Sequence, residues 1–224
     1  MGQILAPDPQ ESSPPSGRTF RRAPGVRQVS RRGYHEPMDF TSTLALLASA
    51  LPVEERDWAV IGGLAVGLRG YPRATLDVDI LVRREALPRL DATLFGRGYR
   101  LEHRWEETSH YQPPPGQLCA IDALHAHRAY ALAMLSRAEQ IELGQGGLAP
   151  PVVQTEDLIG LKLQALVNDP ARAWTETADM RRLLEAAAAS GRRLQRARLE
   201  DYFSLFDRLH LLAELLEGLD DPLR

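Results

Sequence analysis

The stretch WAVIGGLAVGLRGYPRATLDVDILV at residues 58–82 alternates short apolar runs with turn residues. Residues 58–61 predict a buried strand, because four successive apolar residues are bounded by a polar residue and a glycine. Residues 64–69 predict a short helix that ends at Gly70, since glycine commonly takes the left-handed conformation that follows a helix. Residues 77–82 predict a second strand. The pattern therefore predicts a strand, a helix and a strand in close succession.

The second of these strands carries two acidic residues in an apolar context. Asp77 and Asp79 are separated by one residue, and side chains alternate between the two faces of a strand, so both carboxylates point the same way. Val78, Ile80 and Val82 then point to the opposite face and into the core. This alternation predicts a central strand with one apolar and one acidic face.

The rest of the chain continues the mixed pattern and then becomes helical. Further strands are predicted at residues 99–105, 118–124, 140–143 and 151–153. Further helices are predicted at residues 39–51, 85–96, 129–137, 155–169, 171–189 and 194–216. The order predicts an α/β core at residues 38–154, followed by a helical C-terminal region at residues 155–224.

Polar residues and prolines indicate where two of these helices begin and end. Thr41 or Ser42 is expected to cap the first helix, and Thr155 the first C-terminal helix, because a hydroxyl can accept a hydrogen bond from a free amide of the first turn. Pro52 and Pro170 are expected to stop the same two helices, since proline cannot continue the hydrogen-bond ladder.

Residues 1–37 are expected to form a basic, disordered tail. They contain six prolines, six arginines and few large apolar residues, so they cannot bury enough surface to offset the entropy of ordering. Met38 is an alternative translation start. The formal net charge of the whole chain is −3, so the part that follows this basic tail is acidic. An acidic body argues against a broad nucleic-acid-binding surface.

Cysteine content and hydropathy bound the compartment. Cys119 is the only cysteine, which excludes a disulfide framework and a zinc cluster built from several cysteines. No apolar run approaches the roughly 20 residues that span a bilayer. We therefore expect a cytoplasmic protein without a membrane partner.

The acidic strand suggests a metal site. Two carboxylates on one face of a buried strand repel each other and are costly to desolvate, and a bound divalent cation would offset that cost. Oxygen ligands without a nearby histidine or cysteine favour Mg²⁺ or Mn²⁺. Asp122, in another predicted apolar strand, is the candidate third carboxylate, although it could also cap the turn that follows. Solvated edge strands also carry such acidic pairs by chance.

Several other residues suggest a phosphate-binding site. Gly62 and Gly63 lie between a predicted strand and helix, where glycine lets a phosphate approach the backbone, although they could simply form a tight turn. Lys162 is the only lysine, and its ammonium suits a phosphate, whereas the alternative is a surface lysine whose stem lies on apolar neighbours. The remaining candidates are Arg73 and Thr75, in the loop before the acidic strand, and Asp179, on a later helix that could equally carry it as a surface acid.

Taken together, Gly62-Gly63, the R-x-T-x-D-x-D run that starts at Arg73 and the distant Asp122 resemble the signature of the nucleotidyltransferase (DNA polymerase β-like) superfamily. Within it, the chain resembles the AbiEii-type toxins of type IV toxin–antitoxin systems and related minimal nucleotidyltransferases. These share a GG-x-A-x-x-x-x-G stretch, present here from Gly62, and an E-D-L-x-x-x-K pattern, present here with Lys162. The resemblance spans about residues 55–185.

The resemblance implies a fold and a chemistry. The fold is a small mixed β-sheet flanked by helices, followed by helices that close over a nucleotide. Two Mg²⁺ ions would lie between the aspartates and an NTP, and an acceptor hydroxyl would attack the α-phosphate while pyrophosphate leaves. The implied metal ligands are Asp77, Asp79 and Asp122, and the implied nucleotide-binding residues are Gly62, Gly63, Arg73, Thr75, Lys162 and Asp179. One departure is that Glu176, flanked by two threonines, precedes Asp179, where many relatives have an arginine or lysine.

The acceptor is left open by these residues. The toxin resemblance implies a tRNA or protein acceptor and an antitoxin partner. Arginines at 97, 100 and 104, or at 192, 193, 196 and 198, could contact tRNA, but solvated faces explain both groups equally well. The alternatives are transfer to a small molecule, as in antibiotic-modifying relatives, and a catalytically silent nucleotide-binding module. A D-x-D-x-T phosphatase is excluded because Leu81 occupies the threonine position.

Overall fold

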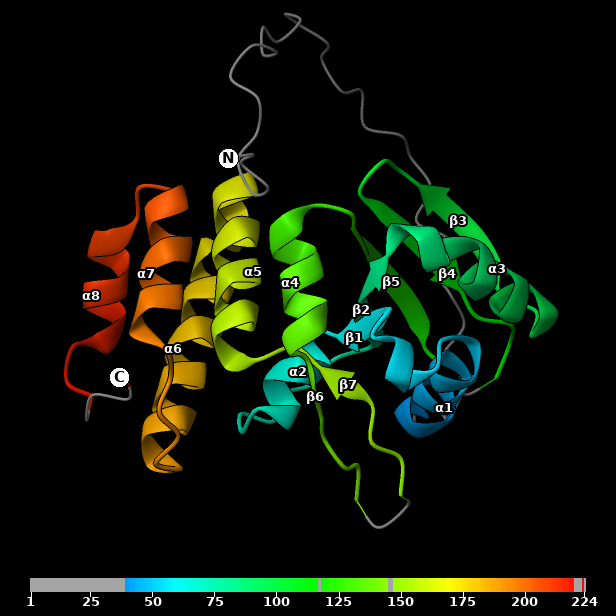
Figure 1. Cartoon of the computed structure of the whole chain (residues 1–224), viewed down its shortest axis with the longest axis horizontal. Coiled ribbons are helices and arrows are strands. Elements are labelled where there is room, and N and C mark those ends of the chain that lie inside the picture. Colours follow the sequence, from blue (N-terminus) through cyan, green and yellow to red (C-terminus); the bar gives the residue numbers. More distant parts are fainter. Residues whose placement is uncertain (1–38, 117, 145–146, 220–222, 224) are drawn as a thin grey trace, which may run out of the picture.

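The computed structural model describes residues 39–116, 118–144, 147–219 and 223. A mixed seven-stranded sheet lies beside a helical C-terminal region (Figure 1). The strands are β1 (Trp58–Val60), β2 (Asp77–Arg83), β3 (Arg100–Arg104), β4 (Thr108–Gln112), β5 (Ala120–Ala126), β6 (Glu139–Gln140) and β7 (Pro151–Val152). The α-helices are α1 (Phe40–Ala50), α2 (Gly62–Leu68), α3 (Leu87–Gly96), α4 (Ala129–Arg137), α5 (Thr155–Asn168), α6 (Ala173–Ala189), α7 (Arg196–Leu205) and α8 (Leu209–Leu216). This architecture confirms the expected α/β class with a mixed sheet and a helical C-terminal region.

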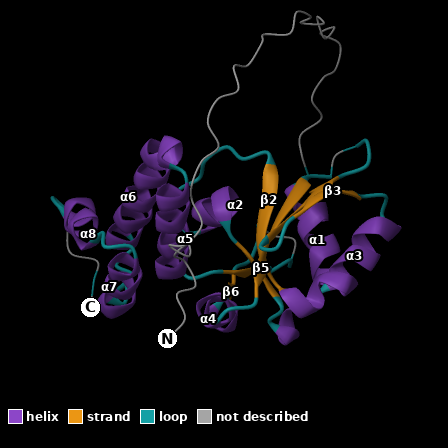
Figure 2. Cartoon of the chain, turned by 90° about the horizontal axis from the view of Figure 1, so that it is seen from above, coloured by secondary structure: helices purple, strands orange, loops and turns teal. Residues whose placement is uncertain are grey.

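The strand order, β3-β4-β5-β2-β1-β7-β6, places β2 in the middle of the sheet. Strand β2 pairs antiparallel with β1 and parallel with β5, and β4 pairs antiparallel with β5 on the other side. In Figure 2, α1 and α3 lie on one side of the sheet, and α2, α4 and α5 lie on the other. The prediction of a central acidic strand is confirmed, with Val78, Ile80 and Val82 all fully buried.

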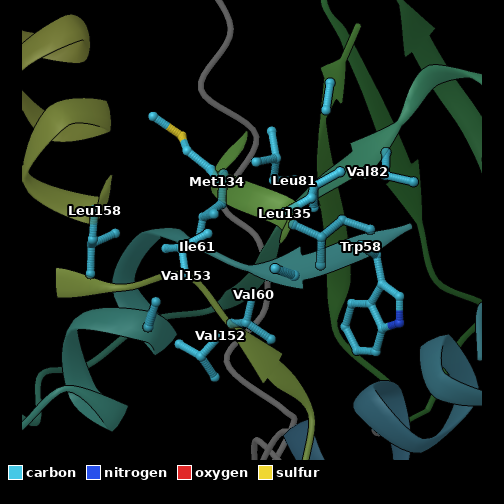
Figure 3. Packing of buried hydrophobic residues seen from close by; sticks show 14 of the residues in the cluster. Trp58, Val60, Ile61, Leu81, Val82, Met134, Leu135, Val152, Val153 and Leu158 are labelled. Carbon is cyan, nitrogen blue, oxygen red and sulfur yellow. The ribbon is translucent and has the colours of Figure 1, made fainter. Parts of the chain in front are cut away.

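The core is centred on β1 and its neighbours, as Figure 3 shows for the side chains around Trp58, Val60 and Leu81. Trp58 is completely buried, and its indole Nε1 donates a hydrogen bond of 2.7 Å to the carbonyl oxygen of Leu51. This bond satisfies the polar atom of the largest core side chain. It also ties the end of the α1 segment to the sheet.

The helix starts differ from the expected ones in three places. Asp39, rather than Thr41 or Ser42, caps α1, because its Oδ1 accepts a bond of 2.9 Å from the backbone amide of Ser42. Thr155 lies inside α5 and is buried, so it packs in the interior instead of capping the helix. The helix expected from residue 171 begins at 173 because a short 3₁₀ turn, Pro170–Arg172, precedes it.

Two larger features were not expected from the sequence. Strand β4 was not predicted, since only Ser109 and Tyr111 point inward and the other three residues of its five are polar. The helix expected at residues 194–216 is two helices, α7 and α8. The chain turns between them at Asp207, whose φ of 54° is left-handed and cannot continue an α-helix.

Smaller differences concern strand lengths and the tail. The strand expected at residues 118–124 runs from Ala120 to Ala126, and the one expected at 140–143 covers only Glu139–Gln140. The expected disordered tail lies outside the described residues. Among the residues described, no helix combines the length and apolar character needed to cross a membrane.

Candidate functional site

Three aspartates converge at the centre of the sheet. Because β2 and β5 are parallel neighbours, Asp79 lies directly opposite Asp122, and Asp77 lies two residues before Asp79 on the same face. Each aspartate offers a carboxylate oxygen, and these oxygens lie within 4.8 Å of one another. The alternation of β2 therefore presents two carboxylates on one face, and the register of β5 brings the third to them.

The electrostatics of this cluster favour a bound cation. Burial, together with the neighbouring charges of Asp77 and Asp122, raises the pKa of Asp79 to about 6. The backbone amide of Gly63 hydrogen-bonds to the Asp79 carboxylate, which opposes part of that rise. Three mutually repelling oxygen ligands, one of them largely desolvated, fit a divalent ion of the Mg²⁺ or Mn²⁺ type.

Gly62 is required by the close approach of α2 to this carboxylate. Its φ is +61°, and a β-carbon on it would lie 1.8 Å from Oδ2 of Asp79. The backbone amide of Ile61 donates to the carbonyl oxygen of Asp79 at 3.0 Å, which holds the two chain segments together. The two glycines belong to the first turn of α2, rather than forming a separate turn before it.

The loop before β2 packs on the same turn. A β-carbon on Gly63 would lie 3.0 Å from both Nη2 of Arg73 and Oγ1 of Thr75. The hydroxyl of Thr75 donates a bond of 2.8 Å to Oδ1 of Asp77. Thr75 thus fixes one oxygen of the first aspartate, and Arg73 lies against the glycine turn.

Lys162 is buried in a cluster of ion pairs. Its ammonium lies 2.9 Å from Oε2 of Glu176 and 2.8 Å from Oδ2 of Asp179. Arg73 lies 3.5 Å from Asp179, and Arg172 also pairs with Glu176. Both carboxylates are buried, so surface roles for the lysine and for Asp179 are excluded. These contacts are ion pairs without hydrogen-bond geometry, since both oxygens of Glu176 and Oδ2 of Asp179 have no hydrogen-bond partner among the described residues.

A cavity of about 580 Å³ connects the two clusters. Four of the residues expected from the sequence line it: Gly62, Asp79, Asp122 and Lys162. The other five, Gly63, Arg73, Thr75, Asp77 and Asp179, do not line the cavity. Of these, Asp179 pairs with Lys162 and Gly63 hydrogen-bonds to Asp79, both of which line it. The cavity lies between the sheet and the helices α5 and α6, so its two walls come from the two halves of the sequence.

Several cavity residues were not anticipated from the sequence as site residues. Glu176 and Arg172 belong to the wall that holds Lys162. His103 and Trp105 also line it, and their rings stack with centroids 5.1 Å apart. His110 contacts the carboxylate of Asp122 through its Nδ1. Nothing in the sequence marked His110 as a site residue, because the strand that carries it was not predicted. The stack of His103 on Trp105 depends on the β3–β4 hairpin.

Other histidines and arginines have structural partners. His125 is buried, its Nε2 lies 2.8 Å from the hydroxyl of Ser109, and burial lowers its pKa. Of the arginines considered for tRNA, Arg104 forms a bidentate pair with Asp91, at 2.7 and 2.9 Å. Arg198 is mostly buried and donates to Gln154. These contacts commit Arg104 and Arg198 to partners within the chain.

Comparison with known proteins finds likeness at the level of the fold. No protein-family model matches the sequence. No curated protein matches it significantly either. The solution structure of the antibiotic-resistance factor ANT(2'')-Ia is similar, with a TM-score of 0.50 and 17% identity over 78% of this chain and 96% of that one.

Two further solved structures are similar at lower scores. A crystal structure of ANT(2'')-Ia in complex with adenylyl-2''-tobramycin has a TM-score of 0.48 and 19% identity, over 78% of this chain and 99% of that one. An antigenic nucleotidyltransferase-like protein from Paracoccidioides brasiliensis has a TM-score of 0.46 and 16% identity, over 80% of this chain and 94% of that one. At these identities the likeness concerns the fold alone, and the AbiEii resemblance stays a prediction. The chain has the fold of the nucleotidyltransferases, with a carboxylate triad at the centre of its sheet.

Proposed function

We propose that this protein is a metal-dependent nucleotidyltransferase, which transfers a nucleoside monophosphate from an NTP to an acceptor hydroxyl. The observation that carries the proposal is the convergence of Asp77, Asp79 and Asp122, whose ligand oxygens lie within 4.8 Å of one another. The raised pKa of Asp79 supports it, because the cluster is unfavourable without a cation. The adjoining cavity of about 580 Å³ has room for a nucleotide.

In the proposed reaction, the acceptor oxygen forms a bond to the α-phosphorus, the bond from that phosphorus to its bridging oxygen breaks, and pyrophosphate leaves. Asp77 and Asp79 would hold two divalent ions, and Asp122 would hold the ion beside the acceptor and take the proton of the acceptor hydroxyl. When bound, the Mg²⁺ or Mn²⁺ ions supply electrostatic stabilisation of the charge that develops on the transferring phosphoryl group. Asp122 suits the acceptor side because its side chain is 42% exposed.

The remaining residues would hold the triphosphate. Gly62 and Gly63 would lie against the β- and γ-phosphates, since glycine permits the close approach. Lys162 would neutralise triphosphate charge, and Asp179 would hold its ammonium in place. Arg73, next to the glycine turn, would add a second positive charge. The helices from residue 155 onwards would form the wall that closes over the nucleotide.

The acceptor is proposed from the resemblance to AbiEii-type toxins, which makes it tRNA or a protein and implies an antitoxin partner. A small-molecule acceptor is the alternative, and the likeness to ANT(2'')-Ia, which concerns the fold alone, favours neither. Growth of cells that express the wild type or Asp77→Ala tests the toxin role. Arrest by the wild type alone is expected, and equal growth of both strains would remove toxicity from the proposal.

Ligand-dependent melting tests the nucleotidyltransferase proposal itself. Mg²⁺ with each NTP in turn is added to the purified protein, and at least one combination is expected to raise the melting temperature. Asp79→Asn is expected to abolish that shift. Glu54→Gln is the matched control, because it makes the same carboxylate-to-amide change at an exposed position outside the site. Equal shifts in wild type and Asp79→Asn would contradict a metal site at the triad.

Release of pyrophosphate then separates an enzyme from a silent binding module. A module that only binds NTP would show the melting shift without pyrophosphate release. For the proposed enzyme, release is expected from the wild type with Mg²⁺ and an acceptor-containing cell extract, and is expected to be lost in Asp79→Asn. Binding without any release in such extracts would favour the silent module.

A further inference from the structure

A row of four polar side chains crosses the sheet from the triad to its edge. Asp79 on β2 lies opposite Asp122 on β5, Asp122 lies opposite His110 on β4, and His110 lies opposite His103 on β3. Residues that face each other across neighbouring strands have side chains on the same face of the sheet. The backbone register, rather than a chance rotamer, therefore brings the His110 imidazole beside the third carboxylate.

The imidazole of His110 has a defined partner on each nitrogen. Its Nδ1 contacts Oδ1 of Asp122. Its Nε2 lies 2.9 Å from the side-chain nitrogen of Gln112 and 3.3 Å from Oε2 of Glu102, and Gln112 donates to the same Glu102 oxygen at 3.1 Å. An ionised carboxylate can only accept, so the contact with Asp122 requires the proton on Nδ1. Glu102 and Gln112 together hold the far edge of the ring, which turns Nδ1 towards the triad.

The contact occupies one oxygen of Asp122 and leaves the other available. Among the described residues, no hydrogen bond ends on Oδ2 of Asp122. The side chains of His110 and Asp122 are 25% and 42% exposed, and both line the cavity, so the pair adds little to the stability of the fold. A hydrogen bond that fixes a carboxylate in an open cavity has the form of an outer-shell contact to a metal ligand.

We propose that His110 is a positioning residue for Asp122. The Nδ1 proton of His110 holds Oδ1 of Asp122, so that Oδ2 of Asp122 points at the divalent ion and the acceptor hydroxyl. This inference rests on the proposed function, because it assigns His110 a task at the same triad. In this role His110 acts on the site through Asp122. Thr75 gives analogous support to Asp77, because its hydroxyl donates to Oδ1 of that residue.

Two substitutions of His110 separate this role from a general structural one. Asn places an amide nitrogen close to where Nδ1 of histidine lies, so His110→Asn keeps a donor to Asp122. His110→Phe keeps a planar ring of similar size and removes the donor. His103→Phe is the matched control, since it makes the same change in a neighbouring histidine that lines the cavity and stacks on Trp105 instead of contacting the triad.

Affinity for Mn²⁺ alone, measured from the electron paramagnetic resonance signal of the free ion, is the main readout. We expect His110→Phe to weaken Mn²⁺ binding by about tenfold or more, as is typical when an outer-shell contact to a metal ligand is lost. His110→Asn and His103→Phe are expected to stay within about threefold of the wild type, a spread well below that loss. Melting temperatures in EDTA are expected to be nearly equal for all four proteins.

The possible results separate this inference from the proposed function. Wild-type Mn²⁺ affinity in His110→Phe would overturn the inference and leave the proposed function intact. Equal losses in His110→Phe and His110→Asn would overturn the role of the Nδ1 donor, whether or not the phenylalanine variant is less stable in EDTA. A wild type that binds no Mn²⁺ would overturn the proposed function and this inference together.

Discussion

Asp79→Asn is expected to stabilise the metal-free protein, although it removes a residue of the proposed site. In the absence of a cation, Asp79 is an ionised carboxylate in a largely desolvated position beside Asp77 and Asp122. The substitution removes that charge and keeps the shape of the side chain. The amide oxygen can still accept the hydrogen bond that the backbone of Gly63 gives to the carboxylate. The change therefore removes an electrostatic penalty and preserves the local packing.

The size of the effect follows from the pKa. Folding raises the pKa of Asp79 from 3.8 to about 6. At about 1.36 kcal/mol per unit, ionised Asp79 lowers the free energy of unfolding by roughly 3 kcal/mol at pH 8. A raised carboxylate pKa means that the folded state binds more protons than the unfolded state between these two values. Wild-type stability from this group is thus lost as the pH rises from about 4 to about 6.

Urea unfolding in EDTA at several pH values measures this difference. Asp79→Asn is expected to exceed the wild type by up to about 3 kcal/mol at pH 8, or roughly 6–12 °C in melting temperature. The advantage should shrink as the pH falls from 6 towards 4, because the wild-type carboxyl becomes protonated. Glu54→Gln, at an exposed position, should show neither effect. Equal or lower stability of Asp79→Asn at pH 8, or an advantage that does not change with pH, would refute the reasoning.

Three further predictions concern the same region. The affinity of the wild type for Mn²⁺ should fall about tenfold per pH unit below pH 6, because the ion must displace the proton of Asp79. Binding that does not change between pH 5 and 7 would contradict this. Gly62→Ala should lower the melting temperature and abolish stabilisation by Mg²⁺ with NTP, since the added β-carbon would lie 1.8 Å from a carboxylate oxygen. The control Gly96→Ala should do neither, because Gly96 has open space around it. In urea unfolding, Lys162→Met should lower the free energy of unfolding by about 3–5 kcal/mol, because it leaves two buried carboxylates without their ammonium. The double variant Lys162→Met with Glu176→Gln should recover part of that loss. A double variant no more stable than Lys162→Met would argue against this ion-pair account.

The elements that could be predicted are those set by local pattern. Three local patterns each placed an element within a few residues of its observed bounds. They are the apolar run at Trp58, the alternation from Asp77 and the glycine after α2. Pro88 lies in the first turn of α3, where its missing amide has no intrahelical partner to lose. These features depend on near neighbours in the chain, so the sequence expresses them directly.

The features that could not be predicted depend on distant partners. Strand β4 exists because it pairs with β3 and β5, and its own five residues are too polar to indicate a strand. Lys162 was expected to face a phosphate. Its two carboxylate partners lie on a different helix, α6, so no pattern near Lys162 in the sequence indicates them. The break at Asp207 likewise has no glycine or proline to mark it.

By itself, the sequence determined that Asp77 and Asp79 share a face of an apolar strand, because side chains alternate at every residue of an extended chain. It also placed Gly62 and Gly63 after the preceding strand, whereas the structure decided that they form the first turn of α2. Only the tertiary structure decided that Asp122 joins this pair, since that depends on the parallel register of β5 against β2. The same holds for His110, which reaches Asp122 because sheet pairing brings residues that are distant in sequence to within a strand spacing of about 4.8 Å.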